Sequence, residues 1–277
     1  MTAASWGDWL HRIRSREIEL IFARCPEAAF GKGLELGAGD GFQSRLLSSY
    51  VKDLVCTDFS ESILAAGDHP ASVAFAVCDA ERVDEVFAAA TFDLVYSSNL
   101  LEHLPRPDAA LRGMHRVLKR EGLAIHVVPN PVWKLSQLVF FYPDLAVRIS
   151  RRLLTTLGLP PARRRPASAP DPARRGGVAI ENNPKASRRP ERHFWPTPHG
   201  AYESNLVELY AYSRRRWLGT FADAGFRVLR VLRGPAASGY GFGLERARRV
   251  LERAGVSTES VYVAAKDGHE SPLARFF

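Results

Sequence analysis

The stretch Gly33-Leu-Glu-Leu-Gly-Ala-Gly-Asp-Gly41 decides the fold of this sequence. In it an apolar run ends in three glycines at alternate positions, and a helical pattern begins directly after them. Glycine lets a chain turn sharply after a strand and lets the backbone approach a ligand closely. The stretch therefore predicts a first strand, a ligand-binding turn and a first helix.

Short apolar runs alternate with helical patterns on the C-terminal side of this turn. The runs cover 33–36, 54–57, 73–77, 92–96 and 123–128, and the helical patterns cover 42–51, 61–67, 81–89 and 108–119. Two further strands are expected at 226–232 and 260–264, with helices at 203–224 and 243–254. Such alternation predicts an α/β fold, a doubly wound and mostly parallel sheet of seven strands with helices on both faces.

Two residues beside the glycines argue against a dinucleotide ligand. Phe42 occupies the third glycine position of the G-x-G-x-x-G pattern, which serves helix packing beneath a pyrophosphate. Glu35, two residues before the first glycine, would repel a pyrophosphate but suits a ligand with an ammonium group. The turn therefore favours a nucleoside ligand that carries a positive charge.

Acidic residues also end the next two apolar runs. Asp58 follows Gly39 by nineteen residues and could accept hydrogen bonds from both ribose hydroxyls, with Phe59 packed on an adenine face. Asp79 could accept from the adenine amino group. Each acid alone is more simply a helix N-cap, but acids at three successive strand ends beside a glycine turn favour a nucleoside site.

These motifs resemble those of class I S-adenosylmethionine (SAM) dependent methyltransferases, of the ubiquinone/menaquinone-biosynthesis-like (methyltransferase type 11) subgroup. The resemblance rests on Gly33–Gly41, Val55–Phe59, Val77–Ala80, Phe92–His103 and Gly122–Pro129. It implies a Rossmann-like methyltransferase fold with an antiparallel last strand, SAM as cofactor, and a long insertion after the fifth of these strands. The cofactor-binding residues it implies are Glu35, Gly37, Ala38, Gly39, Gln43, Asp58, Phe59, Asp79, Ala80, Ser98 and Asn99.

A general base is needed if the methyl acceptor is a hydroxyl, and two histidines are the candidates. His103 follows the fourth strand and therefore lies at the cofactor end of the sheet, where the alternative is a structural histidine in the turn before Pro105. His199 could reach the site from the insertion. His126, inside the fifth strand, is more simply a core residue. Some relatives bind a metal through E-x-x-E-H, but Asn99 replaces the first acid here, so we expect no metal site.

The chain divides into a helical cap (1–30), a SAM-binding core (31–128), an insertion (129–202) and the C-terminal part of the sheet (203–277). Within the insertion, residues 132–157 present apolar side chains that could form a lid, a pair of helices on a membrane surface, or a dimer interface. Residues 161–192 carry nine basic and three acidic side chains, so this loop is either a solvated flexible segment or a contact for phosphates.

We expect methyl transfer to a hydroxyl of a small-molecule or lipid-linked acceptor, such as a glycan. RNA or protein methylation and a non-catalytic SAM-binding regulator are the alternatives, and nucleic acid is disfavoured because no Asn-Pro-Pro-Tyr-type motif follows the fourth strand. Contact with an anionic membrane and a homodimer stay open. Three scattered cysteines and the absence of a long apolar segment predict a cytoplasmic location.

Overall fold

The computed structural model describes residues 6–62, 73–156, 202–237 and 245–277. Its centre is a seven-stranded sheet with the strand order β3-β2-β1-β4-β5-β7-β6. The strands are β1 (Phe30–Leu36), β2 (Val51–Asp58), β3 (Val73–Val77), β4 (Phe92–Ser98), β5 (Leu118–Pro129), β6 (Phe226–Arg233) and β7 (Glu259–Lys266). β7 is antiparallel to both of its neighbours. The predicted seven-stranded α/β fold with an antiparallel last strand is confirmed.

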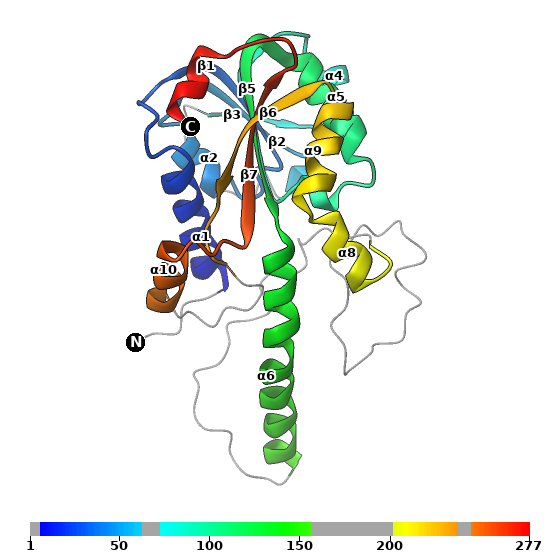
Figure 1. Ribbon diagram of the computed structural model, residues 1–277. Coiled ribbons are helices and arrows are strands. Elements are labelled where there is room, and N and C mark those ends of the chain that lie inside the picture. The colour runs from blue at the N-terminus through cyan, green and yellow to red at the C-terminus, as the bar shows by residue number, and fades with distance from the viewer. Residues whose placement is uncertain (1–5, 63–72, 157–201, 238–244) are drawn as a thin grey trace.

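Helices cover both faces of this sheet (Figure 1). The helices are α1 (Trp6–Ile21), α2 (Phe42–Leu47), α4 (Val83–Val86), α5 (Pro107–Val117), α6 (Pro131–Thr156), α8 (Asn205–Ala211), α9 (Arg214–Asp223) and α10 (Glu245–Arg253), with short 3-10 helices η1 (Ala80–Arg82), η2 (Leu101–His103) and η4 (Pro272–Phe276). The predicted helix at 61–67 lies largely outside the described residues.

The core consists of two apolar clusters, one on each side of the sheet. One contains Leu111 and Met114 of α5 and Phe221 of α9. The other contains Ile18 and Ile21 of α1, with further residues from α2, η4 and the strands. Side chains alternate between the two clusters along each strand, as the two-residue period of a strand requires. The near-continuous apolar strands are explained by this burial on both faces.

The strand order reverses direction between β1 and β4, and this reversal creates the site. β1 pairs with β2 on one side and with β4 on the other. The chain therefore builds one half of the sheet with β2 and β3 and then returns to build the other half, beginning with β4. The carboxyl ends of parallel strands meet at one edge, and ligands of such sheets bind where the order reverses. β7 begins at this same edge, because Glu259 lies opposite Pro129 at the end of β5.

The helical pattern over 203–224 forms two helices, so the prediction of one helix is wrong. α8 ends at Ala211, and α9 begins at Arg214. The Ser213 side chain accepts a hydrogen bond from the backbone N–H of Arg216, which makes it the N-cap of α9. Serine is a strong N-cap because its hydroxyl satisfies an N–H that has no partner in the first turn. The break lets α8 diverge from α9 toward α6 (Figure 1).

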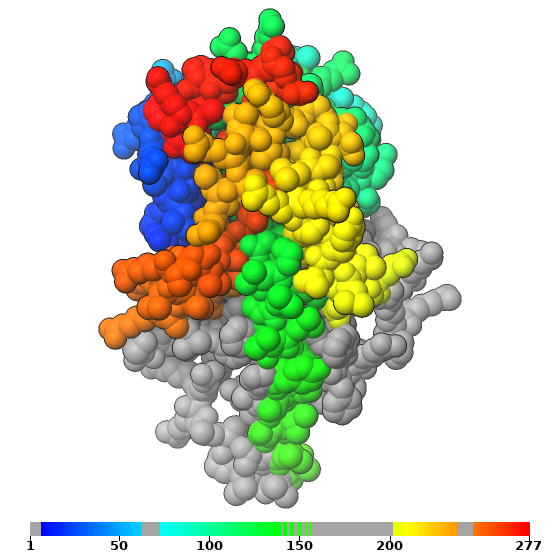
Figure 2. All heavy atoms as spheres, in the orientation of Figure 1, coloured from blue at the N-terminus to red at the C-terminus, as the bar shows by residue number. Residues whose placement is uncertain are grey.

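The first half of the predicted insertion is a single helix, so the pair of helices, one of the alternatives for this segment, is not formed. α6 runs without interruption from Pro131 to Thr156 and projects from the edge where β5 ends (Figure 1). Its first turns lie between α10 and the α8–α9 pair, and its far end extends beyond both (Figure 2). No helix in the described ranges is long and apolar enough to cross a membrane. His199 and the basic loop lie outside those ranges.

Candidate active site

The glycine turn after β1 is built in a conformation that only glycine adopts readily. Gly37, Gly39 and Gly41 have φ values of 75°, 57° and 73°, in the left-handed region. The backbone N–H groups of Gly37 and Ala38 donate to the carbonyl of Thr57 at 2.8 and 2.9 Å, which fixes the turn against β2. A Cβ placed on Gly39 would meet nothing within 4 Å, so the turn faces open space on that side. This geometry fits a ligand lying close to the backbone.

Asp58 at the end of β2 is fixed beside this turn. One carboxyl oxygen accepts from the N–H of Gly39 at 3.1 Å, and the other accepts from the N–H of Ser60 at 3.0 Å. Each oxygen keeps a second lone pair, so the carboxylate can still accept from ribose hydroxyls. The adjacent Phe59 is 56% exposed, which leaves its ring accessible to an adenine. Both groups are accessible to a ligand, and their contacts with ribose and adenine stay predictions.

Asp79 caps η1, as the simpler interpretation of this acid expected. Its Oδ1 atom accepts from the N–H of Glu81 at 2.9 Å. Capping leaves Oδ2 and further lone pairs, so the carboxyl could also accept from an adenine amino group. Ala80, the next residue, is buried. The cap explains why an acid stands here whether or not a ligand is bound.

Two buried polar groups lie behind the glycine turn. Glu35 lies in β1 beside Cys56 of β2, whose thiol donates to its carboxyl at 3.2 Å. Burial raises the pKa of Glu35 above its usual value. In α2, the Nε2 atom of Gln43 is buried and has no hydrogen-bond partner among the described residues. An unpartnered donor at this place fits a site that a polar ligand completes.

The end of β4 turns sharply at two predicted cofactor residues, Ser98 and Asn99. Asn99 adopts a φ of 49°, in the left-handed region, where asparagine is tolerated better than most residues. Its side-chain amide donates to the Ser98 hydroxyl at 3.2 Å. The turn directs the following η2, with Glu102 and His103, along the carboxyl edge of the sheet. Ser98, Asn99 and His103 are therefore brought together, as predicted.

Helix α1 closes the site and supplies an ion pair that the sequence analysis missed. His11 stacks on Phe42 with ring centroids 3.8 Å apart, and its Nε2 atom lies 3.0 Å from Oδ2 of Asp40. Arg14 donates to Glu17 at 2.6 Å and to Ser98 at 2.5 Å, and Ser98 donates to Glu17 at 2.5 Å. The N-terminal cap is thus joined to both the glycine turn and the end of β4.

A signal for this ion pair was present in the sequence. Positions 14, 17, 18 and 21 lie on one face of a helix, and Ile18 and Ile21 of this face are buried. The charged residues Arg14 and Glu17 occupy the other two positions and interrupt this apolar face. A charged side chain that is buried needs a partner. Glu17 is completely buried, so this interruption marks a polar site rather than a solvated surface.

Two more carboxyls converge on the same place. Glu102 of η2 and Glu259 at the start of β7 are 4% and 5% exposed. Burial raises the pKa of Glu102 to about 8 and holds that of Glu259 well above its usual range. The Nε2 atom of His103 lies 3.9 Å from Oε1 of Glu102, and burial lowers the pKa of this histidine. His103 is therefore neutral near pH 7 and able to accept a proton.

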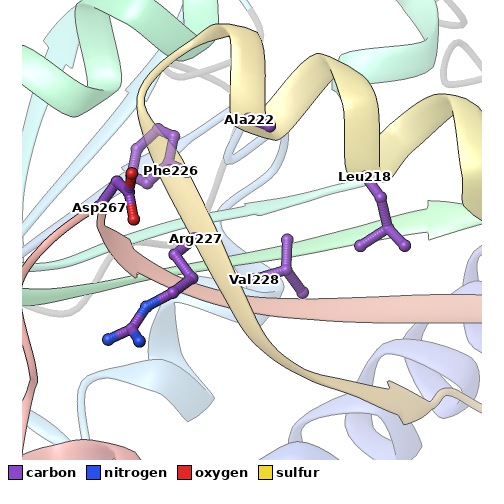
Figure 3. A pocket seen from close by; sticks show the side chains of 6 residues that line it. All are labelled: Leu218, Ala222, Phe226, Arg227, Val228 and Asp267. Carbon is purple, nitrogen blue, oxygen red and sulfur yellow. The ribbon is translucent and has the colours of Figure 1, made fainter.

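A separate depression lies far from this site (Figure 3). It is lined by Leu218, Ala222, Phe226, Arg227, Val228 and Asp267. Phe226 begins β6 and Asp267 follows the end of β7, which places the depression at the edge opposite the glycine turn. None of the predicted site residues belongs to it.

Comparison with known proteins supports both the fold and the cofactor. Residues 34–126 match a family model described as a methyltransferase domain. This segment holds the end of β1, the strands β2 to β4, most of β5 and every cofactor residue predicted from Glu35 to Asn99. None of the curated proteins compared matches the chain.

Several solved structures share the fold over nearly the whole chain. A chain from the complex of the Haloferax volcanii Trm112 methyltransferase activator with a methyltransferase has a TM-score of 0.53 at 15% identity and covers 94% of this chain and 95% of its own. A SAM-dependent methyltransferase from Mesorhizobium loti has a TM-score of 0.51 at 17% identity, with 91% and 99% covered. The [4+2]-cyclase SpnF has a TM-score of 0.52 at 16% identity, with 95% and 84% covered.

At these identities the likeness shows the fold alone, and the cyclase shows that the fold also serves other chemistry. The methyltransferase family match falls on the segment that carries the glycine turn and the acids at the ends of β2 and β3. Residues 34–126 therefore contain a methyltransferase domain, and this match, the seven-stranded sheet and the open glycine turn support a SAM-dependent methyltransferase with SAM as its cofactor.

Proposed function

We propose that this enzyme transfers the methyl group to a hydroxyl oxygen of a small-molecule or lipid-linked acceptor, such as a glycan. The observation that carries the proposal is a neutral imidazole at the cofactor edge of the sheet. His103 follows β4 directly, its side chain is about one third exposed, and burial keeps its pKa below the usual value. A neutral histidine suits an acceptor that must lose a proton as it is methylated.

The residues of the site have distinct tasks in this reaction. SAM supplies a methyl group already activated by the sulfonium leaving group. As the acceptor oxygen bonds to the methyl carbon and the carbon–sulfur bond breaks, the hydroxyl proton passes to His103. The glycine turn, Asp58 and the end of β4 hold the reacting groups in line, which accounts for much of the rate of such transfers. α1 covers the site through Arg14 and His11 and excludes water.

The surface beside the site supports an acceptor with an apolar part. We define the apolar ridge as the exposed side chains Leu135, Val139 and Leu153 of α6 with Leu206 and Tyr210 of α8, which are between 49% and 78% exposed. A buried ion pair, Lys134 with Glu208 at 2.6 Å, joins the two helices. An exposed apolar surface of this kind fits a lipid tail or an anionic membrane surface. A second copy of the chain is the alternative occupant.

The Glu102-His103 sequence after β4 also supports the ubiquinone/menaquinone-biosynthesis-like subgroup, which the family match does not resolve. Some members of that subgroup also carry a Glu-His pair after the fourth strand.

The proposal is tested by measuring S-adenosylhomocysteine release with a panel of hydroxyl-bearing acceptors. For an acceptor that is turned over, we expect His103→Gln to lower kcat by about a hundredfold or more, the usual worth of a general base. SAM affinity should stay unchanged, and the control His269→Gln, at the opposite edge of the sheet, should behave as wild type. Full turnover by His103→Gln would exclude a histidine base at this position and favour catalysis by proximity alone.

A further inference from the structure

We infer that the acceptor carries an ammonium group, which binds between the side chains of Glu102 and Glu259. The inference rests on the proposed function for the place of the acceptor, at the carboxyl edge of the sheet. It specifies the chemical class of the acceptor. The molecule carries a hydroxyl that receives the methyl group and a nearby amine that binds to the enzyme.

The two carboxyls reach this place from parts of the chain far apart in sequence. Glu102 belongs to η2 after β4, and Glu259 begins β7 opposite the end of β5. Both interact electrostatically with Arg14 and Glu17 of α1. These interactions place the four side chains near one another at the carboxyl edge of the sheet, and Glu102 also interacts with Glu259. His103, the proposed base, also interacts with Arg14 and lies at the same edge.

Each of the two carboxyls keeps an oxygen without a partner. The Oε2 atoms of Glu102 and Glu259 are buried and accept no hydrogen bond from any described residue. Leaving a buried polar atom unsatisfied costs roughly 1–3 kcal/mol. Two such atoms on neighbouring carboxyls indicate that a polar ligand completes the site.

The balance of charge indicates the sign of that ligand. Arg14 is the cationic side chain that stands among the largest influences on the pKa values of both Glu102 and Glu259. Arg14 is already paired with Glu17. Burial consequently raises the pKa of Glu102 and Glu259, as happens to acids that lack a cationic partner. An ammonium group would supply the missing charge and up to three N–H donors.

Two other ligands are less suited to this space. A metal ion needs several close ligands, and no group of three His, Cys, Asp or Glu side chains in the described ranges could hold one. A polyol without an amine could bond to the unpartnered oxygens but would supply no positive charge to favour the ionised form of the two carboxyls. The amine therefore accounts for both the unpartnered atoms and the charge.

The experiment compares glucosamine with N-acetylglucosamine and glucose, which present sugar hydroxyls without a positive charge. Binding to the S-adenosylhomocysteine-loaded enzyme is measured by calorimetry, so the readout does not depend on turnover. We expect glucosamine to bind at least about tenfold more tightly than either neutral sugar. Glu102→Gln and Glu259→Gln should each remove most of this preference, whereas Glu121→Gln, an exposed acid at the amino end of β5, should keep it.

Equal binding of the three sugars, binding of none of them, or a preference that survives both glutamine variants together would overturn the inference. Each variant is first shown to be folded by circular dichroism and by unchanged affinity for S-adenosylhomocysteine. The proposed function fails separately: it is contradicted if amine-bearing acceptors bind preferentially but yield no oxygen-methylated product. Oxygen methylation without amine preference would instead leave the proposed function intact and remove only the inference.

Discussion

At the scale of single residues, Glu102 is the group whose ionisation couples the site to folding. Its pKa is about 8 in the folded protein and close to 4.5 in an unfolded chain, because burial disfavours the carboxylate. A carboxyl with a raised pKa contributes stability that is fully present below pH 4.5 and is lost as pH rises through about 8. We therefore expect Glu102→Gln, which cannot ionise, to gain stability relative to wild type between pH 5 and 8.

Urea unfolding at pH 5, 6.5 and 8 measures this difference, with Glu121→Gln as the exposed control. The control should follow the wild-type profile. Parallel profiles for wild type and Glu102→Gln would show that Glu102 titrates near its ordinary pKa in the folded protein.

The residues that could be predicted are those that a local motif marks. The glycine turn, Asp58 and the Ser98-Asn99 turn each follow an apolar run, so strand ends alone located them. Glu259 carries no such mark, because its place opposite Pro129 depends on the pairing of β5 with β7, 130 residues apart. Asp79 was marked, but the N–H of Glu81 that it caps could not be distinguished from a ligand by sequence.

At the scale of elements, strands were easier to predict than the helices of the C-terminal part. β3 matches its predicted range, and the other strands are one to six residues longer than predicted, because end residues such as Lys32 and Asp53 are polar although they pair. The break between α8 and α9 escaped prediction since apolar spacing continues across Tyr212 and Ser213. Only the capping hydroxyl of Ser213 marks where one helix ends and the next begins.

This cap makes a prediction about stability. Ser213→Ala removes the hydrogen bond to the N–H of Arg216 and should destabilise the protein by about 1 kcal/mol, the usual worth of an N-cap. Ser213→Asp restores an acceptor and should recover most of the loss. Chemical denaturation of the three proteins checks this. If the alanine variant were as stable as wild type, the separation of α8 from α9 would have another cause.

At the scale of the whole molecule, α6 is about 39 Å long, given a rise of about 1.5 Å per residue, and its far half projects from the α/β body (Figure 1). The apolar ridge lies on this helix and on α8, and the basic segment 161–192 follows α6 in the sequence. Apolar side chains next to basic ones are typical of a membrane-surface contact. We expect the protein to sediment with vesicles containing phosphatidylserine and to be released by salt.

Val139→Asp together with Leu153→Asp should weaken this binding severalfold, because a charge replaces an exposed apolar side chain on the ridge. Val250→Asp, an equally exposed position on α10, is the matched control and should bind as wild type. If sedimentation depended neither on the charge of the lipid nor on the two ridge substitutions, membrane binding by the apolar ridge would be excluded. Self-association of the chain would then be the remaining explanation, and light scattering measures it.

The central claim is that SAM binds at the glycine turn through Asp58, and isothermal calorimetry tests it most directly. Wild type should bind SAM in the micromolar range and show no heat with NADH. Asp58→Ala should weaken SAM by roughly ten- to a hundredfold, since it removes charge-assisted hydrogen bonds to the ribose worth about 1.5–3 kcal/mol. Asp53→Ala, an exposed acid in the same strand, should leave the affinity unchanged. Binding of NADH without SAM, or an Asp58→Ala variant with wild-type affinity, would contradict the claim.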